Sequence, residues 1–494
     1  MKGTFIQGLI LAIAQILSRL LSLAFIFFLA NKGKPLGLYL YTYSYIPFSL
    51  FLDISAFGII PGISKSVSTL NSEYKNANTN YLLKSGTIFS IITGIIFYFI
   101  VNIFKNQILL VTLYEGYTKE EYDLILNNLS IASISILIYP LLSFYKGYMQ
   151  GHMKMLPTAL SIIFEGATRL ILLFLIGNNV DFTFFTKVFM INFVSYLVGL
   201  FIILLFVFKC YLRKGRPFHS LIYVLRRIIP FGMATLFFTI YQLIDSITLS
   251  DIPAHTYTTY MFEAMRLLYI PIVACGAIAS VLTPRINNLY TKNEIDLAIK
   301  ISSSITNSSI IILVIIVYLF FHNSELIYTL FYGEGSFSIL RNTAVLIIFI
   351  GLYKILIGLA QGMPKFEYII IVAILSSIAK YTLNILLVPS YGYIGSIIST
   401  ISALAICLFF SYYLLNKGGI KIFLENIKSL IIAFLSLIVS IFFAVIFNSL
   451  VINNSVLDSY NLLPSFFIIL FYILIISFVN LLRVTKNKYL HINK

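Results

Sequence analysis

The chain has 494 residues, of which 60% are hydrophobic and 11% are charged, and its formal net charge is +16. Soluble domains carry about 25% charged residues, so this composition excludes a soluble protein. The apolar runs are roughly 18–25 residues long, the length of a helix across about 30 Å of hydrocarbon, whereas barrel strands are about half as long. The sequence therefore predicts an all-α integral membrane protein.

Reading the apolar runs in chain order, between polar breaks, predicts fourteen transmembrane helices. The first run ends in "NKGKP" without a small-residue cleavage site, so we expect a retained helix rather than a signal peptide. The expected spans lie near residues 5–30, 38–60, 83–104, 125–145, 157–177, 184–208, 228–249, 257–283, 302–321, 339–360, 368–389, 394–414, 429–450 and 464–482.

The basic residues are distributed asymmetrically between the expected loops. When the spans are numbered from a cytoplasmic N-terminus, most of the 34 Lys and Arg fall on the cytoplasmic side, and the loop 209–227 is especially rich in them. This is the positive-inside pattern, so we expect a multi-pass membrane protein with both termini in the cytoplasm. The positive charge thus reflects membrane topology, and we expect no nucleic-acid partner.

A short polar motif occurs twice in this apolar chain. The octapeptide "GYMQGHMK" at 147–154 is matched by "GLAQGMPK" at 358–365, and "YIP" at 45–47 is matched at 269–271. Several such matches in the same order indicate an internal repeat. Since the repeat spans six helices, an even number, both copies insert in the same orientation, which is typical of transporters whose substrate site lies between the repeats.

The repeat predicts the organisation of the chain. We expect an N-lobe of helices 1–6 in residues 1–227 and a C-lobe of helices 7–12 in residues 228–415. Residues 416–494 would add helices 13 and 14, with a cytoplasmic tail. The fold class is therefore a two-lobed, pseudo-symmetric helical membrane protein.

Polar side chains in the first two spans of each repeat lie one helical turn apart. A charge at mid-bilayer costs at least ~2.5–3.5 kcal/mol, so such residues usually face a cavity or a partner. Because these spans are equivalent in the two repeats, we expect them to line one central, water-accessible cavity. The candidate substrate-binding residues are Gln15, Arg19, Asp53, Gln242, Asp245, Glu263, Arg266 and Lys380.

Other charges in the spans have a simpler structural explanation. Glu165 and Arg169 lie four residues apart on one expected helix, and we expect them to neutralise each other. Lys354 lies near the end of its expected span, so we expect its side chain to reach toward the membrane surface.

Two of the candidate sets leave an alternative open. Arg19 has no acidic neighbour on its own helix, but it could pair with Asp53 of the next helix instead of binding a substrate. Glu263 and Arg266 lie three residues apart and could form a buried ion pair of their own.

The sequence offers no recognisable disulfide framework or metal site. The three cysteines lie in or beside expected helices, and the five histidines lack the spacing of metal ligands. We therefore expect no cofactor. Coupling of transport to Na+, to H+ or to the membrane potential remains open.

Three long stretches carry a resemblance to a known family: "SRLLSLAF", "YIPFSLFLDISAFGIIPGISKSVS" and "GYMQGHMKMLPTALSIIFEGATRLILLF". They resemble the stage V sporulation protein B branch of polysaccharide transporters. This branch belongs to the multidrug/oligosaccharidyl-lipid/polysaccharide exporter superfamily, which includes the lipid II flippases. The resemblance implies a fourteen-helix fold that flips undecaprenyl-diphosphate-linked sugars outward, with cavity arginines at positions 19 and 266.

These observations favour a flippase for a lipid-linked cell-wall precursor, with lipid II as the first expectation and another lipid-linked polysaccharide unit as the alternative. A cation-coupled multidrug exporter of the same superfamily is a second hypothesis, because Asp53, Asp245 and Glu263 could bind organic cations. A membrane enzyme would need a catalytic constellation, which the short loops do not offer. We expect a non-enzymatic protein that works as a monomer, with a lipid-linked oligosaccharide and membrane lipids as its partners.

Overall fold

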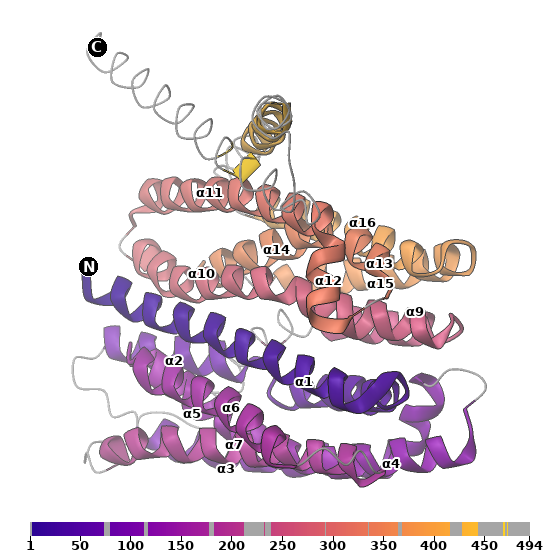
Figure 1. Cartoon of the computed structure of the whole chain (residues 1–494). Coiled ribbons are helices and arrows are strands. Elements are labelled where there is room, and N and C mark those ends of the chain that lie inside the picture. The colour runs from indigo at the N-terminus through magenta and orange to yellow at the C-terminus, as the bar shows by residue number, and fades with distance from the viewer. Residues whose placement is uncertain are drawn as a thin grey trace, which may run out of the picture.

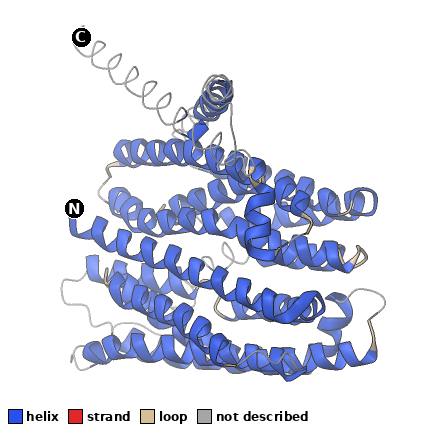
Figure 2. Ribbon diagram, in the orientation of Figure 1, coloured by secondary structure: helices blue, strands red, loops and turns tan. Residues whose placement is uncertain are grey.

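The computed structural model describes residues 2–73, 80–112, 117–176, 182–211, 232, 239–291, 293–333, 335–363, 368–414, 427–442, 468, 469 and 472. Within these ranges every regular element is a helix, as Figure 2 shows. Nine of the described helices are long and apolar enough to cross a membrane, or ten if the bent pair α13 and α14 counts as one span. The prediction of an all-α membrane protein is therefore confirmed. Most of the fourteenth expected span, and residues 228–231 and 233–238 of the seventh, lie outside the described residues.

The first half of the chain forms an N-terminal bundle. Its elements are α1 (Lys2–Ser55), α2 (Ile59–Glu73), α3 (Asn80–Thr112), α4 (Lys119–Ser133), the 3-10 helix η1 (Ile134–Leu137), α5 (Tyr139–Gly151), α6 (Met155–Leu175) and α7 (Phe182–Tyr211). We expected a break between the first two spans, whereas α1 is helical throughout. A straight helix would place Arg19 and Asp53 about 50 Å apart at 1.5 Å per residue. Both line one cavity, so α1 turns back on itself between them.

Local sequence signals explain two boundaries that differ from the expected ones. The second expected span continues to Ser68 through a turn in which Gly58 adopts a φ of 64°, a left-handed conformation that suits glycine. The fourth span begins six residues before the expected position 125, at Lys119. It does so because Thr118 and Glu121 form a capping box, which satisfies two backbone N–H groups at the helix start.

The second half of the chain forms a C-terminal bundle together with the helical segment 239–248. Its elements are α9 (Ala254–Thr258), the π-helix η2 (Thr259–Ala264), α10 (Met265–Thr291), α11 (Ile295–His322), α12 (Ser324–Tyr332), α13 (Phe337–Thr343), α14 (Leu346–Gln361), α15 (Tyr368–Tyr391) and α16 (Tyr393–Leu414). The short helix α12 was not expected. The span expected at 339–360 is divided into α13 and α14, which meet at a 43° bend.

Figure 1 shows the two bundles as two layers, with α1–α7 below and α9–α16 above. Helices α1 and α10 pack against each other where the layers meet. The described helices are thus arranged as two lobes. The expected lobe boundaries at residues 227 and 415 lie outside the described residues.

The repeated octapeptide has the same packing role in both bundles. Gly147 and Gly151 on α5 face α2. Gly358 on α14 and Gly362, which directly follows α14, face α10. A Cβ atom on Gly147 would lie 2.7 Å from a carbonyl oxygen of α2, and one on Gly358 would lie 2.5 Å from a side-chain carbon of α10. Small residues spaced in this way let membrane helices approach closely. Each copy of the motif thus lies at a close helix pair, one in each bundle.

Candidate functional site

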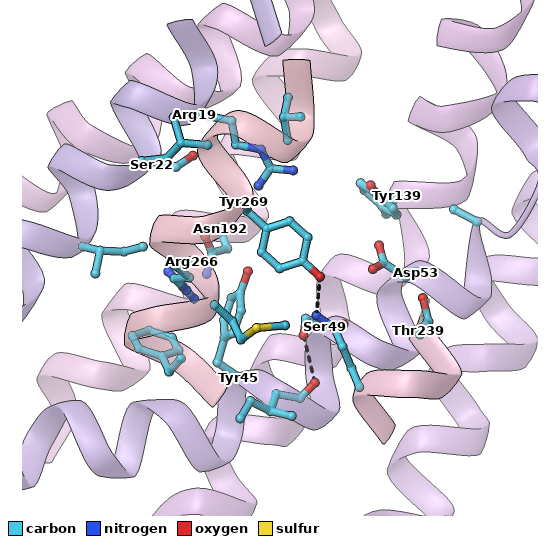
Figure 3. Close-up of a pocket in the computed structure, with 18 of the residues that line it drawn as sticks. Arg19, Ser22, Tyr45, Ser49, Asp53, Tyr139, Asn192, Thr239, Arg266 and Tyr269 are labelled. Carbon is cyan, nitrogen blue, oxygen red and sulfur yellow. Dashed lines mark hydrogen bonds between the residues drawn. The ribbon is translucent and has the colours of Figure 1, made fainter. Parts of the chain in front are cut away.

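A cavity lies between the two bundles. It consists of two overlapping hollows of about 460 Å³ and about 700 Å³, which share Arg19, Asp53, Arg169 and Lys354 in their walls. The walls come from α1, α2, α5, α6 and α7 on one side and from the segment 239–248, α10 and α14 on the other. Figure 3 shows labelled residues of the smaller hollow pointing toward a common space. The cavity therefore lies between the two bundles, where the internal repeat led us to expect a substrate site.

The smaller hollow has an excess of positive charge. Its charged residues are Arg19, Asp53, Arg169, Arg266 and Lys354, which are four bases and one acid. Arg19 and Arg169 come from the N-terminal bundle, whereas Arg266 and Lys354 come from the C-terminal bundle. A cavity with four bases from two bundles can bind a multivalent anion, and that anion would hold the bundles together.

Arg266 is held between two aromatic rings. Its guanidinium carbon lies 3.7 Å from the centroid of the Phe262 ring and 4.5 Å from that of Tyr45. Such cation–π contacts orient the planar group. Its Nη2 atom is buried and has no hydrogen-bond partner among the described residues. Buried donors are rarely left unpaired, so this N–H group is a candidate donor to an anionic ligand in the cavity.

The backbone before Arg266 departs from regular helix. Residues Thr259–Ala264 form the π-helix η2, and such turns often occur at functional sites. Glu263 lies in this turn, and its carboxylate accepts a hydrogen bond of 2.6 Å from the Tyr328 hydroxyl of α12. Glu263 therefore anchors η2 to α12 and does not line the cavity. The described ion pairs do not include Glu263–Arg266, so that alternative is not realised.

Arg19 and Asp53 face the cavity from the two arms of α1. Both side chains are exposed and line the smaller hollow, and Figure 3 shows them at separate positions around it. They do not belong to the two ion pairs found within 4.0 Å among the described residues. The alternative in which Arg19 is neutralised by a direct pair with Asp53 is therefore not realised in this conformation.

The expected pairing of Glu165 with Arg169 is wrong. The Glu165 carboxylate lies 2.8 Å from the ammonium of Lys146 on α5. Arg169 turns instead toward α7, where its Nε donates to the Ser195 hydroxyl at 3.0 Å and its guanidinium lies 4.9 Å from the Tyr196 ring centroid. A partner from a neighbouring helix thus replaces the partner on the same helix, and Arg169 joins the cavity wall.

Lys354 also differs from expectation. It lies well inside α14 and lines both hollows, so its side chain is part of the cavity wall and not at the membrane surface. The reason is that α14 passes beside α10 at the interface of the bundles, so this part of its surface faces the cavity. Sequence reasoning did not assign Arg169 or Lys354 to the cavity. The signal that could have done so was the position of each base inside an apolar span.

The remaining predicted residues divide into two groups. Gln15 lines the larger hollow and Gln242 the smaller one, where the Gln242 amide donates to the Tyr269 hydroxyl at 2.8 Å. Asp245 and Lys380 do not line the cavity, because they form a buried ion pair of 2.7 Å inside the C-terminal bundle. Of the eight candidates, five therefore meet in the cavity: Gln15, Arg19, Asp53, Gln242 and Arg266.

Residues 7–290, more than half of the chain, match the family model described as polysaccharide biosynthesis protein. The chain is 23% identical to the protein named lipid II flippase MurJ of Bacillus subtilis (strain 168), and the match covers 84% of this chain and 82% of that relative.

Two solved structures show the same fold. One, titled lipid II flippase MurJ, inward closed conformation, has a TM-score of 0.69 at 17% identity and covers 95% of this chain and 98% of that chain. The other is an outward-facing multidrug resistance MATE family transporter of the MOP superfamily, with a TM-score of 0.66 at 15% identity and coverage of 86% and 96%. These relatives are transporters and not enzymes, so the predicted resemblance and the non-enzymatic character of the chain are confirmed.

Proposed function

Because this chain belongs to the family of polysaccharide biosynthesis proteins that matches its residues 7–290, we propose that it is a flippase for a lipid-linked cell-wall precursor. The precursor would carry an undecaprenyl-diphosphate group and would move from the inner to the outer leaflet. We propose lipid II as the substrate, in line with the named activity of the relative from Bacillus subtilis.

The charge of the cavity is the observation that carries this proposal. A diphosphate has several negative oxygens, and arginine binds such groups with two parallel N–H bonds. Arg19 and Arg266 approach the smaller hollow from different bundles and would hold the diphosphate between them. The larger hollow, lined by polar groups such as Gln15, Ser64 and Gln150, would hold the sugars. The polyprenyl chain would remain in the lipid.

Transport by alternating access requires contacts between the bundles that can open on each side in turn. On one side, the Tyr43 ring stacks on Tyr257 with centroids 5.0 Å apart. On the other, the Lys65 ammonium donates to the backbone carbonyl of Gln361 at 3.0 Å. Each contact joins the N-terminal to the C-terminal bundle. We propose that the two contacts break alternately as the substrate crosses.

A multidrug exporter is the second candidate, since the fold is shared with a MATE transporter. An organic cation in the smaller hollow would meet four bases and a single acid, Asp53. Two of the three acids that supported this hypothesis, Asp245 and Glu263, lie outside the cavity wall. The charge of the site therefore favours an anionic substrate.

Reconstitution into proteoliposomes tests the proposal. The proteoliposomes would carry a fluorescent undecaprenyl-diphosphate sugar in both leaflets, and a membrane-impermeant quencher would reach only the outer leaflet. When the protein is present, the fraction of quenched fluorescence should increase over time as the lipid moves from the inner to the outer leaflet. Arg19→Ala should remove this activity, whereas Arg341→Ala, a matched arginine on α13 outside the cavity, should retain it. Transport of an organic cation without transport of the diphosphate would refute the proposal. Selective transport of a different lipid-linked glycan would refute lipid II as the substrate.

A further inference from the structure

A second group of polar residues lies inside the C-terminal bundle, away from the cavity. At its centre the Lys380 ammonium lies 2.7 Å from Asp245 Oδ1 and donates to the Thr400 hydroxyl at 2.6 Å. Lys380 is 0% exposed and Asp245 is 5% exposed, although both lie in spans of a membrane protein. An unpaired charge at this depth is costly, so the ammonium and the carboxylate depend on each other.

The carboxylate is also held by uncharged donors. The Ser396 hydroxyl donates to Asp245 Oδ1 at 2.6 Å, and the Asn384 amide donates to the same atom at 2.9 Å. Asn384 in turn bonds to the Thr248 hydroxyl at 2.7 Å and accepts a hydrogen bond from Ser399. The group thus joins three elements, the segment 239–248, α15 and α16, around one negative charge.

The atoms around the Lys380 nitrogen resemble the ligands of a small monovalent cation. They are a carboxylate oxygen of Asp245 and the hydroxyl oxygen of Thr400 in direct contact, with the Ser396 hydroxyl one hydrogen bond further away, on the carboxylate. Hard cations prefer carboxylate, hydroxyl and carbonyl oxygens. An ammonium group carries the same single charge and donates to the same oxygens. A separate Na+ does not fit beside it, because the lysine nitrogen already occupies the space between Asp245 and Thr400.

We propose that this group is a cation site whose cation is the chain's own Lys380 ammonium. A chain without that ammonium would bind a free monovalent cation, such as Na+ or methylammonium, at the same oxygens. The site lies one helical turn beyond Gln242, which faces the cavity, so the tethered cation fixes a segment of the cavity wall. The wild-type chain would need no free metal ion here, whichever substrate it carries.

Thermal unfolding of the purified full-length protein tests this inference. Choline chloride would be exchanged for LiCl, NaCl or methylammonium chloride at constant ionic strength. The wild-type Tm should be the same in all four salts. Lys380→Ala should have a Tm several degrees lower in choline chloride, and Na+ or methylammonium should raise it with saturation. Adding Asp245→Asn to Lys380→Ala should abolish that response.

Two results would overturn the inference. The first is a folded Lys380→Ala variant whose Tm does not respond to any of the small cations. The second is a saturable Na+ response of the wild type that Asp245→Asn removes, because the wild type would then bind a free ion at this site.

If Lys380→Ala does not accumulate, a variant that removes both charges still tests the inference. The double variant Asp245→Asn with Lys380→Met has neither charge, so it should accumulate and should not respond to cations. Its accumulation, with Lys380→Ala absent, would support the need for a cation beside Asp245. If this double variant were also absent from the membrane, the inference would be wrong.

Discussion

Replacing Arg266 is the sharpest test of the diphosphate site. The guanidinium lies 3.7 Å from the Phe262 centroid and has a buried, unpaired Nη2 atom. Two charge-assisted hydrogen bonds to a phosphate contribute about 1.5–3 kcal/mol each, or roughly 3–6 kcal/mol together. Since about 1.4 kcal/mol corresponds to a factor of ten, Arg266→Ala should reduce flipping roughly 100-fold to 10,000-fold.

Arg266→Lys separates charge from geometry. Lysine keeps the positive charge but loses the planar group that stacks between Phe262 and Tyr45 and the second hydrogen bond. We expect flipping between those of the wild type and Arg266→Ala, about tenfold or more below the wild type. Phe262→Leu keeps the arginine and removes one ring, and should cost less, about 0.5–2 kcal/mol in substrate affinity.

The assay is the initial flipping rate of a fluorescent undecaprenyl-diphosphate sugar in proteoliposomes, normalised to the amount of inserted protein. Arg341→Ala controls for the loss of an arginine outside the cavity. A normal rate for Arg266→Ala, with normal insertion, would refute the assignment of Arg266 to the diphosphate. If the variant loses insertion or thermal stability in proportion to its rate, Arg266 supports the fold and does not bind the substrate.

Three further predictions test other parts of the structure. Glu165→Lys should destabilise the protein by about 3–5 kcal/mol, because it breaks the buried ion pair with Lys146. Adding Lys146→Glu should restore much of the lost Tm, and a double variant as unstable as the single one would argue against the pair. Gly147→Ala and Gly358→Ala should lower the Tm, because their Cβ atoms would lie 2.7 and 2.5 Å from the facing helix, whereas Gly276→Ala, with its nearest atom 3.9 Å away, should not. In a background without native cysteines, Ser220→Cys should be labelled only after permeabilisation and Ser336→Cys in intact cells, and the opposite pattern would invert the expected topology.

Sequence alone could predict those cavity residues that are charged and also lie in equivalent spans of the two repeats. Arg19 and Asp53 belong to the first two spans of one repeat, and Arg266 belongs to the second span of the other. A charge inside an apolar span must find a cavity or a partner, and equivalent spans of parallel repeats meet at a shared axis. The structure places all three residues in the same cavity.

Arg169 and Lys354 were missed because their surroundings depend on neighbouring helices. Lys146 lies one residue beyond the expected fourth span, so the sequence placed it in a loop, and Arg169 was the nearest base to Glu165. In the structure α5 continues to Gly151, which brings Lys146 inside the bundle to pair with Glu165. Arg169 therefore does not pair with Glu165 and lines the cavity instead. An error of a few residues in a helix boundary was enough to assign the wrong partner.

Lys380 was predicted to bind the substrate but lies outside the cavity, and its difference from Arg266 explains this error. Both are bases inside apolar spans, so sequence reasoning assigned both to the substrate. Lys380 is completely buried, with its charge balanced by Asp245 and its donors used by Asp245 and Thr400. Arg266 lies between rings that supply no hydrogen bond to its Nη2, and no acid pairs with it among the described residues. A base in a membrane span can therefore be assigned to a ligand only when the facing helices leave its charge unbalanced, and that condition depends on which helices pack together.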